Sequence, residues 1–123
     1  MNFENFSVGT DIEEIKRFED KTLEYDRNFL ERVFTKKELD YCFSKSLPQF
    51  SLCARFCAKE AVVKALSNYR IKDIFYSDIE ILNNDDGSPY VFLKKYPNMQ
   101  IKISLSHAKT YASATVIIYY EQK

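Results

Sequence analysis

The spacing of apolar residues changes a little past the middle of the chain, and this change constrains the fold more than any other feature. Up to Leu66 the apolar residues recur at intervals of three and four, which is typical of helices that bury one face. From Ser77 onward apolar and polar residues alternate, which is typical of strands. Helices followed by strands predict an α+β fold, with N-terminal helices packed on a mainly antiparallel sheet.

Two capping signals predict where helices begin. Asp11 is followed three residues later by Glu14, and Thr35 is followed three residues later by Glu38, which is the spacing of a capping box. We therefore expect a short strand over residues 6–10 that leads into a helix capped by Asp11. A second helix is expected to begin after Thr35.

The remaining elements follow from turn residues and from the apolar pattern. A helical turn is expected over residues 27–33, and a long helix opened by Pro48 is expected to reach about Leu66. Alternation separated by turn-forming residues predicts two hairpins, with strands at 77–82, 90–93, 101–106 and 111–120.

Length and charge restrict the classes of protein to be considered. A chain of 123 residues predicts a single domain, 1–123, with a substantial core. The formal net charge is zero, so no overall charge favours nucleic acid or membrane as a partner. No apolar run reaches the roughly 18 residues of a membrane helix, and the N-terminal residues lack the pattern of a secretion signal.

Cysteine and glycine usage narrows the choice further. The odd set Cys42, Cys53 and Cys57 lacks paired spacing and fits a reducing cytoplasm. A zinc site would need about four ligands, and the chain has one histidine, so we expect buried core thiols. With two glycines, the chain has neither a P-loop nor a dinucleotide-binding glycine pattern.

The segment RFCAKEAVVKAL, residues 55–66, places charged groups around a stripe of small residues. On a helical wheel Glu60 and Lys64 lie one turn apart, opposite the stripe, and Arg55 and Lys59 lie between the two faces. Glu60 and Lys64 form either a solvated salt bridge, worth roughly 0.2–0.5 kcal/mol, or part of a site. Arg55 and Lys59 are equally well explained as a solvated edge.

Asp11 and His107 also have two interpretations each. Asp11 is a good N-cap, but the junction of a strand and a helix can also present a side chain into a cleft. His107, the single histidine, is either structural or part of a set of donors with Ser104, Ser106 and Lys109 that could hold a phosphate.

Blocks of residues along the chain form a recognisable series. They are GTDIEEIKR at 9–17, RVFTKKEL at 32–39, RFCAKEA at 55–61, KAL at 64–66, DIEI at 78–81 with Gly87 and Pro89, and ISLSH at 103–107 with Tyr111 and Ala112. In order and spacing, from about Val8 to Val116, the series resembles the holo-acyl-carrier-protein synthase family, the single-domain type of 4′-phosphopantetheinyl transferase.

The resemblance implies the fold of this family and a magnesium-dependent reaction in the cytoplasm. The reaction would transfer 4′-phosphopantetheine from coenzyme A to a serine of an apo acyl carrier protein for fatty acid biosynthesis, leaving adenosine 3′,5′-bisphosphate. A carrier of polyketide or peptide synthesis, or a non-catalytic module of the same fold, is the alternative. The resemblance also implies a homotrimer with active sites shared between subunits, in which Asp11 and Glu60 need not come from one chain.

Site residues are implied by the positions that match the family. Asp11 and Glu60 match its metal ligands, which for Mg²⁺ are typically one or two carboxylates. Lys64 would lie against the pyrophosphate or help to handle the serine proton. Either Glu60 or a metal-bound water would relay that proton, and the sequence does not decide between them. Arg55 and His107 match contacts to the nucleotide phosphates.

Two further features concern the partner and the cofactor pocket. Arg17 and Lys21, with Lys16, match the region that docks the acidic recognition helix of the carrier protein, and a solvated helix face is the alternative explanation. After Leu66 the family usually has a glycine-rich turn, whereas this chain continues with Ser67, Asn68, Tyr69 and Arg70. This difference affects the shape of the cofactor pocket and the choice of carrier.

Overall fold

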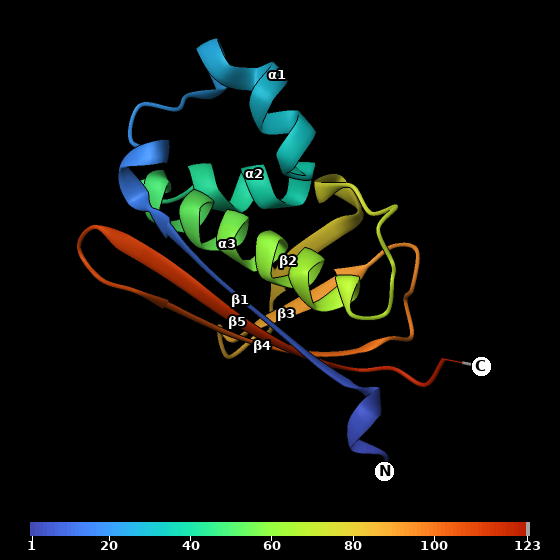
Figure 1. Ribbon diagram of the computed structural model, residues 1–123. Helices are drawn as coiled ribbons and strands as arrows, with labels where there is room; N and C mark the ends of the chain where they lie inside the picture. The colour runs from blue at the N-terminus through green and yellow to red at the C-terminus, as the bar shows by residue number, and fades with distance from the viewer. Residues whose placement is uncertain (123) are drawn as a thin grey trace.

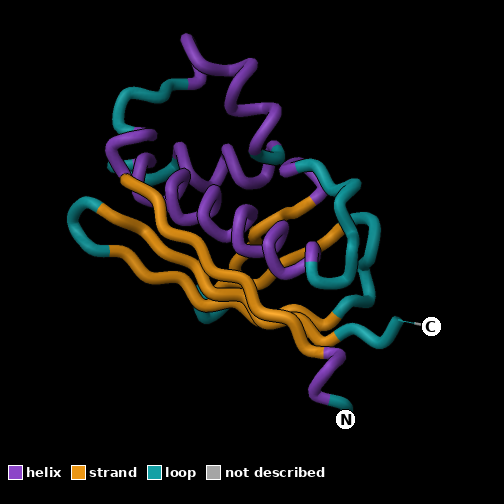
Figure 2. Tube along the Cα trace, viewed as in Figure 1, coloured by secondary structure: helices purple, strands orange, loops and turns teal. Residues whose placement is uncertain are grey.

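Helices cover one face of an antiparallel sheet in the computed structural model, which describes residues 1–122 (Figure 1). The long helix α3 (Pro48–Ser67) lies across the sheet, and α1 (Leu23–Val33) and α2 (Lys36–Phe43) lie beyond it (Figure 2). In chain order the elements are η1 (Phe3–Asn5), β1 (Phe6–Glu14), η2 (Ile15–Phe18), α1 (Leu23–Val33), α2 (Lys36–Phe43), α3 (Pro48–Ser67), η3 (Tyr76–Asp78), β2 (Ile79–Asn83), β3 (Pro89–Leu93), β4 (Gln100–His107) and β5 (Tyr111–Tyr119). The α+β prediction is confirmed.

The main sheet joins the two ends of the chain. Its strand order is β1-β5-β4, both pairs are antiparallel, and β2 and β3 form a separate two-stranded sheet. Asp11 pairs with Ala114 and His107 pairs with Ala112, so both side chains belong to the face of the sheet that carries α3. The two hairpins predicted from the sequence are present. β1 forms an edge strand of the main sheet, and local patterns did not predict its pairing with β5.

β1 and α3 approach each other unusually closely because small residues line their contact. Ala58, Ala61 and Ala65 on α3 are fully buried. A Cβ at Gly9 would collide with the carbonyl oxygen of Ala61 and come within 2.9 Å of the amide nitrogen of Ala65. Glycine at this position therefore permits the contact, which brings the second half of β1 beside the polar residues of α3.

The prediction of a helix that begins at Asp11 was wrong. β1 continues through Asp11 to Glu14, which pairs with Tyr111, and only the short 3-10 turn η2 follows. A continuous ladder of hydrogen bonds with β5 outweighs the local capping signal. The side chains of Asp11 and Glu13 consequently share one face of a strand instead of standing at a helix end.

The other helices agree more closely with the sequence. The capping box of Thr35 and Glu38 opens α2, and α3 covers the predicted span from Pro48. α1 begins earlier than residue 27, because the Thr22 side chain accepts a hydrogen bond from the Tyr25 amide and caps it. The four strands of the two hairpins fall within two residues of their predicted bounds, whereas β1 extends four residues beyond the predicted end at residue 10.

The interpretation of Arg55 and Lys59 as a solvated edge was also wrong. Arg55 is 5 % exposed, and Lys59 is completely buried. The ammonium of Lys59 lies 2.7 Å from a carboxylate oxygen of Glu38, whose side chain is buried as well. Tertiary packing of α2 and η3 against α3 covers the flank that a helical wheel assigns to solvent.

α3 ends in a turn that uses arginine where glycine is common. Arg70 has a φ of 61°, in the left-handed region, and the Ile71 amide donates to the Leu66 carbonyl. Tyr69 is turned back into the core, where its hydroxyl donates to the carbonyls of Asn5 and Ile118. The turn is therefore closed without glycine, and Tyr69 is directed away from the surface.

One cluster of buried apolar residues connects the helices to both sheets. It includes the three cysteines, which are free and buried as the sequence predicted. Among the described residues, no helix is both long enough and apolar enough to span a membrane.

Candidate active site

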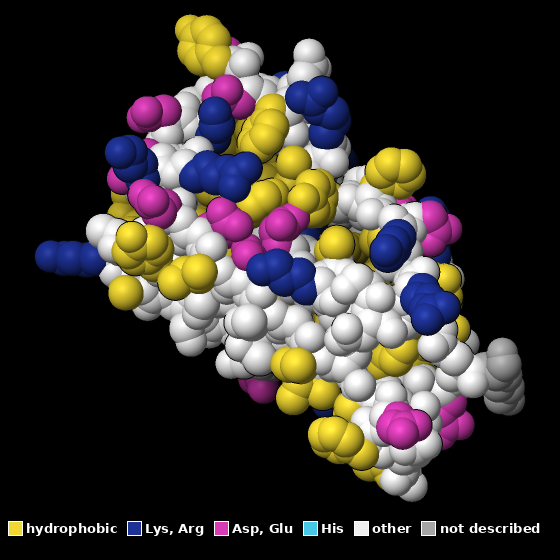
Figure 3. Space-filling view, viewed as in Figure 1, with side chains coloured by type: hydrophobic (Ala, Val, Ile, Leu, Met, Phe, Trp, Pro, Cys, Tyr) yellow, Lys and Arg dark blue, Asp and Glu magenta, His cyan; other side chains and the backbone are white. Residues whose placement is uncertain are grey.

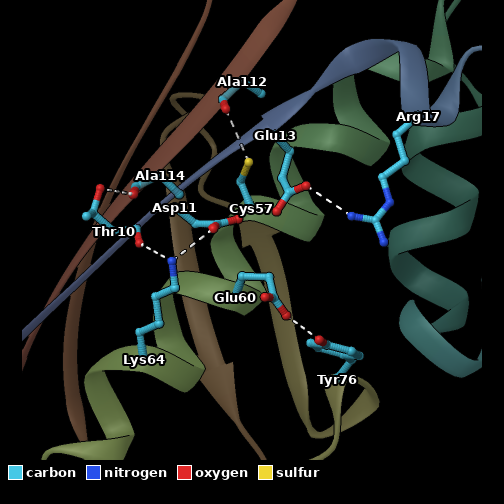
Figure 4. Close-up of polar contacts among 10 residues, drawn as sticks. All are labelled: Thr10, Asp11, Glu13, Arg17, Cys57, Glu60, Lys64, Tyr76, Ala112 and Ala114. Carbon is cyan, nitrogen blue, oxygen red and sulfur yellow. Dashed lines mark hydrogen bonds and ion pairs between the residues drawn. The ribbon is translucent and has the colours of Figure 1, made fainter.

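Three carboxylates meet where β1 lies against α3. Asp11, Glu13 and Glu60 each offer an oxygen, and these oxygens lie within 4.8 Å of one another (Figure 4). Asp11 and Glu13 point to the same side because they are two residues apart on a strand, and Glu60 faces them from the helix. All three residues are partly buried. One chain thus supplies both Asp11 and Glu60, contrary to the possibility that they come from different subunits.

Lys64 is paired with Asp11 rather than with Glu60. Its ammonium nitrogen lies 3.1 Å from Asp11 Oδ1 and 3.0 Å from the Thr10 carbonyl oxygen, to both of which it donates. The predicted salt bridge within α3 is therefore replaced by a bond that joins α3 to β1. The side chain of Lys64 remains 55 % exposed, so its charge is accessible to a ligand at the cluster.

The other two carboxylates also have one partner each. Arg17 Nη1 donates to Glu13 Oε1 at 3.0 Å, and the hydroxyl of Tyr76 donates to Glu60 Oε1 (Figure 4). The bond to Glu60, together with partial burial, raises the pKa of Tyr76 to about 12, so its hydroxyl keeps the proton that it donates.

The cluster has the features that a hard cation requires. Burial, reinforced by the neighbouring carboxyl of Asp11, raises the pKa of Glu13, which is the effect of crowding negative charge in a partly dry site. Asp11 Oδ2 is buried and has no hydrogen-bond partner within residues 1–122. Carboxylate oxygens are the ligands that Mg²⁺ prefers, so the residues present fit such an ion.

A buried ion pair supports the site from the other side of α3. The Lys59 ammonium, paired with Glu38, also donates to the carbonyl oxygens of Tyr76, at 2.9 Å, and of Ile79. Glu38 in turn accepts from the amide of Ile81 at 2.9 Å. This network fastens η3 and the start of β2 to α3, and η3 carries the tyrosine that contacts Glu60.

Arg55 and His107 line a second site, a cavity of about 320 Å³. Arg55 Nη2 donates to Asn83 Oδ1 at 2.6 Å, and its guanidinium lies 4.1 Å from the ring centre of Tyr41. Arg55 Nε is buried and has no partner in the described part of the chain. The ring of His107 packs beside that of Phe50, with 5.5 Å between centres. The cavity therefore combines a positive charge, an imidazole and a buried donor that no described residue engages.

The cavity and the carboxylate cluster face different directions from α3. Arg55 and Glu60 are five residues apart, which corresponds to a rotation of about 140° and a rise of about 7.5 Å. The structure brings Asp11, Glu60 and Lys64 together, and it brings Arg55 and His107 together, but it keeps the two groups apart within one chain.

The basic residues near η2 lie beside the acidic cluster. Figure 3 shows acidic side chains in the middle of this face, with basic side chains above and below them. The side chain of Arg17 is 51 % exposed although it bonds Glu13, and the side chain of Lys21 is 34 % exposed, with its ammonium 3.8 Å from Asp26. Arg17 and Lys21 thus place positive charge at the surface, in the segment around η2 and beside the carboxylates.

Sequence reasoning missed Glu13, Tyr76 and Lys59. A correct strand prediction would have placed Glu13 on the same face as Asp11, because residues i and i+2 of a strand point the same way. For Lys59 the sequence offers one weak indication, which is that it adjoins Glu60. It offers none for Tyr76, because the contact of Tyr76 with Glu60 depends on how η3 folds back onto α3.

Comparisons with known proteins agree with one another. Residues 7–116 match the model of a family described as the 4′-phosphopantetheinyl transferase superfamily. The chain is similar to the holo-[acyl-carrier-protein] synthase of Protochlamydia amoebophila, with 41% identity over 115 residues that cover 89% of this chain and 94% of the relative. It is 46% identical over 118 residues to that of Dehalococcoides mccartyi, and the match covers 89% and 95% of the two chains.

Solved structures show the same similarity. A holo-(acyl-carrier-protein) synthase from Bacillus anthracis in complex with CoA (3′,5′-ADP) superposes with a TM-score of 0.77 at 30% identity, covering 94% of this chain and 96% of that chain. The Helicobacter pylori synthase in complex with coenzyme A gives a TM-score of 0.76 at 31% identity, with 90% and 98% covered. The match to the family model, over residues 7–116, includes the residues of the carboxylate cluster and of the cavity at Arg55.

Proposed function

The chain belongs to the 4′-phosphopantetheinyl transferase superfamily, and we propose that it is a holo-acyl-carrier-protein synthase of fatty acid biosynthesis. It transfers 4′-phosphopantetheine from coenzyme A to a serine of an apo acyl carrier protein and requires Mg²⁺. Its place of action is the cytoplasm, and residues 1–123 form one domain, a proposal that the buried apolar cluster of the described residues supports. The observation that carries the proposal is the carboxylate cluster, in which a buried oxygen of Asp11 has no hydrogen-bond partner among the described residues and lies beside the ammonium of Lys64.

Asp11 and Glu60 would hold the metal, with Glu13 close enough to join them. A bound Mg²⁺ would supply positive charge that neutralises the pyrophosphate of coenzyme A and the group that leaves. The residues of the chain then have separable tasks. Lys64 places a second positive charge at the same point, and its contact with Asp11 keeps it there.

The proton of the attacking serine needs an acceptor at the cluster. Glu60 is the carboxylate proposed for this task, because α3 presents it to the cluster and Tyr76 donates to its Oε1. In this arrangement Tyr76 remains a donor throughout and holds the carboxylate in place.

The cavity at Arg55 and His107 would bind the nucleotide end of coenzyme A. Phosphate oxygens accept strongly from guanidinium groups, and Nε of Arg55, which has no partner in residues 1–122, provides a donor that is already buried. Arg17 and Lys21 would receive the acidic carrier, because charge at the rim of a site steers an oppositely charged partner toward it.

The same reaction on a carrier from polyketide or peptide synthesis is the second candidate, and a non-catalytic module is the third. Mass spectrometry of several apo carriers incubated with the protein, coenzyme A and Mg²⁺ separates them. We expect the mass of a phosphopantetheine group on the fatty-acid carrier. Modification of secondary-metabolite carriers alone would favour the second candidate, and no modification of any carrier by the folded protein would favour the third.

A homotrimer with shared sites completes the proposal. The two halves of the site face apart on α3, so a complete site needs the cavity of one subunit beside the cluster of another. The outer face of the main sheet offers a surface for this assembly, because Val8, Ile12, Tyr111 and Ile117 expose 47–64% of their area on adjacent strands. A second copy of the chain is the partner that would cover them.

Placing a charge on this sheet face is expected to break the trimer. Light scattering after gel filtration should give three times the 14.5-kDa chain mass for the protein and 14.5 kDa for Ile117→Lys. Tyr90→Lys, which adds the same charge at an exposed aromatic residue of the separate sheet, should remain trimeric. A wild-type monomer, or a trimeric Ile117→Lys variant, would contradict this assignment.

A further inference from the structure

Tyr76 donates a hydrogen bond to the carboxylate of Glu60, although no sequence pattern indicated a role for Tyr76. Glu60 is a long side chain on a helix surface, and a free glutamate of this kind samples several rotamers. In residues 1–122 the hydroxyl of Tyr76 is the one hydrogen-bond donor to this carboxylate. The position of Glu60 Oε1 is therefore set by η3, an element separate from the helix that carries Glu60.

Tyr76 is itself held firmly from two directions. Its ring packs against the ring of Phe56, with 5.7 Å between centres, and its carbonyl oxygen accepts from the buried ammonium of Lys59 at 2.9 Å. Lys59 is buried and its ammonium is held in place by Glu38, so the backbone of Tyr76 is anchored to a fixed charge in the core. The hydroxyl is thus presented to Glu60 from a rigid support.

We propose that Tyr76 is a positioning residue, which fixes Glu60 Oε1 so that the other carboxylate oxygen is directed toward Asp11 and Glu13. The inference rests on the proposed function only in taking the cluster to be a metal site. Groups that hydrogen-bond to a metal ligand and orient it typically contribute a factor of about 10–100 to metal affinity. Tyr76 acts through Glu60 and does not itself touch the substrate.

Tyr76→Phe is the test, because it removes one hydroxyl and keeps the ring that packs on Phe56. Binding of Mn²⁺ alone to the free protein, followed by electron paramagnetic resonance, should weaken by about tenfold. In transfer assays the Mg²⁺ concentration that gives half-maximal rate should rise by a similar factor, whereas kcat at saturating Mg²⁺ should stay within about threefold of wild type.

The matched control is Tyr96→Phe, which removes a hydroxyl from a partly buried tyrosine far from the cluster. It should leave Mn²⁺ affinity unchanged. It thereby shows whether the loss of a tyrosine hydroxyl away from the cluster affects Mn²⁺ binding through general stability. If Tyr76→Phe does not fold, Tyr76→Met provides the same test with a more adaptable side chain. Unchanged Mn²⁺ affinity in a folded Tyr76 variant would overturn the inference.

The outcome is separable from that of the proposed function. A protein that binds Mn²⁺ in a Tyr76-dependent manner but modifies no carrier would retain the positioning role and lose the proposed reaction. A protein that modifies its carrier, and whose Tyr76→Phe variant binds Mn²⁺ as tightly as wild type, would retain the reaction and lose the positioning role.

Discussion

Replacing Glu60 with glutamine is expected to reduce phosphopantetheine transfer by more than about 100-fold and to leave the protein folded. Glutamine keeps the shape of the side chain and can still accept the hydrogen bond from Tyr76. It removes the negative charge, and with it both a strong ligand for Mg²⁺ and the proposed acceptor of the serine proton. The rate of mass gain on the carrier, measured at saturating Mg²⁺, gives the size of the effect.

The fold of this variant should be unaffected because Glu60 is only partly buried and forms no salt bridge among the described residues. Urea unfolding should therefore show a change of at most about 1 kcal/mol. Glu4→Gln, at an exposed position next to the opposite end of β1, should have wild-type activity and serves as the control. Transfer by Glu60→Gln within a few fold of wild type would mean that this helix face is an ordinary polar surface.

Replacing Lys59 with methionine is expected to cause the largest loss of stability of any lysine substitution in this chain. Methionine fills a similar volume but leaves Glu38 without its partner in the core, and it removes the donor to the carbonyl oxygens of Tyr76 and Ile79. Breaking a buried pair by removing one partner costs about 3–5 kcal/mol. Domains of this size are stable by about 5–15 kcal/mol, so the loss should be evident in urea unfolding.

An exposed pair of similar geometry provides the control. Lys36 lies 3.0 Å from Asp40, and the side chains are 88% and 66% exposed. Lys36→Met should cost at most about 1 kcal/mol, because water screens an exposed pair. Equal losses for the two variants would contradict the view that the buried Lys59–Glu38 pair is a structural anchor.

Much of the fold could be predicted because the chain contains clear local signals for where helices begin and where strands run. The capping box at Thr35 and Glu38 and the proline at the start of α3 are local features, and the structure contains both. The alternation in the last third of the chain likewise reports strands directly. The capping signal at Asp11 failed because β1 gains a complete ladder with β5, whose residues lie about a hundred positions away in the sequence.

The site was predictable where it depended on one helix and on the family pattern, and unpredictable where it depended on packing. The spacing of Glu60 and Lys64 indicated a pair, and the resemblance to the family implied their role in the site, but the partner of Lys64 proved to be Asp11. The burial of Lys59 and the reach of Tyr76 follow from how η3 lies against α3, which no local spacing encodes. The contacts of Lys59 and Tyr76 are tertiary, and they support Glu60, which the family pattern indicated.

We propose that a single divalent ion, held by Asp11 and Glu60, marks the point of the protein at which the reaction takes place. Crystals grown with Mn²⁺ and coenzyme A test it most directly, because the anomalous scattering of manganese locates the ion without reference to the protein coordinates. We predict one strong peak per chain within coordination distance of carboxylate oxygens of both Asp11 and Glu60, beside the pyrophosphate. A peak elsewhere, or coenzyme A bound with no peak between these two carboxylates, would show that Asp11 and Glu60 do not hold the ion.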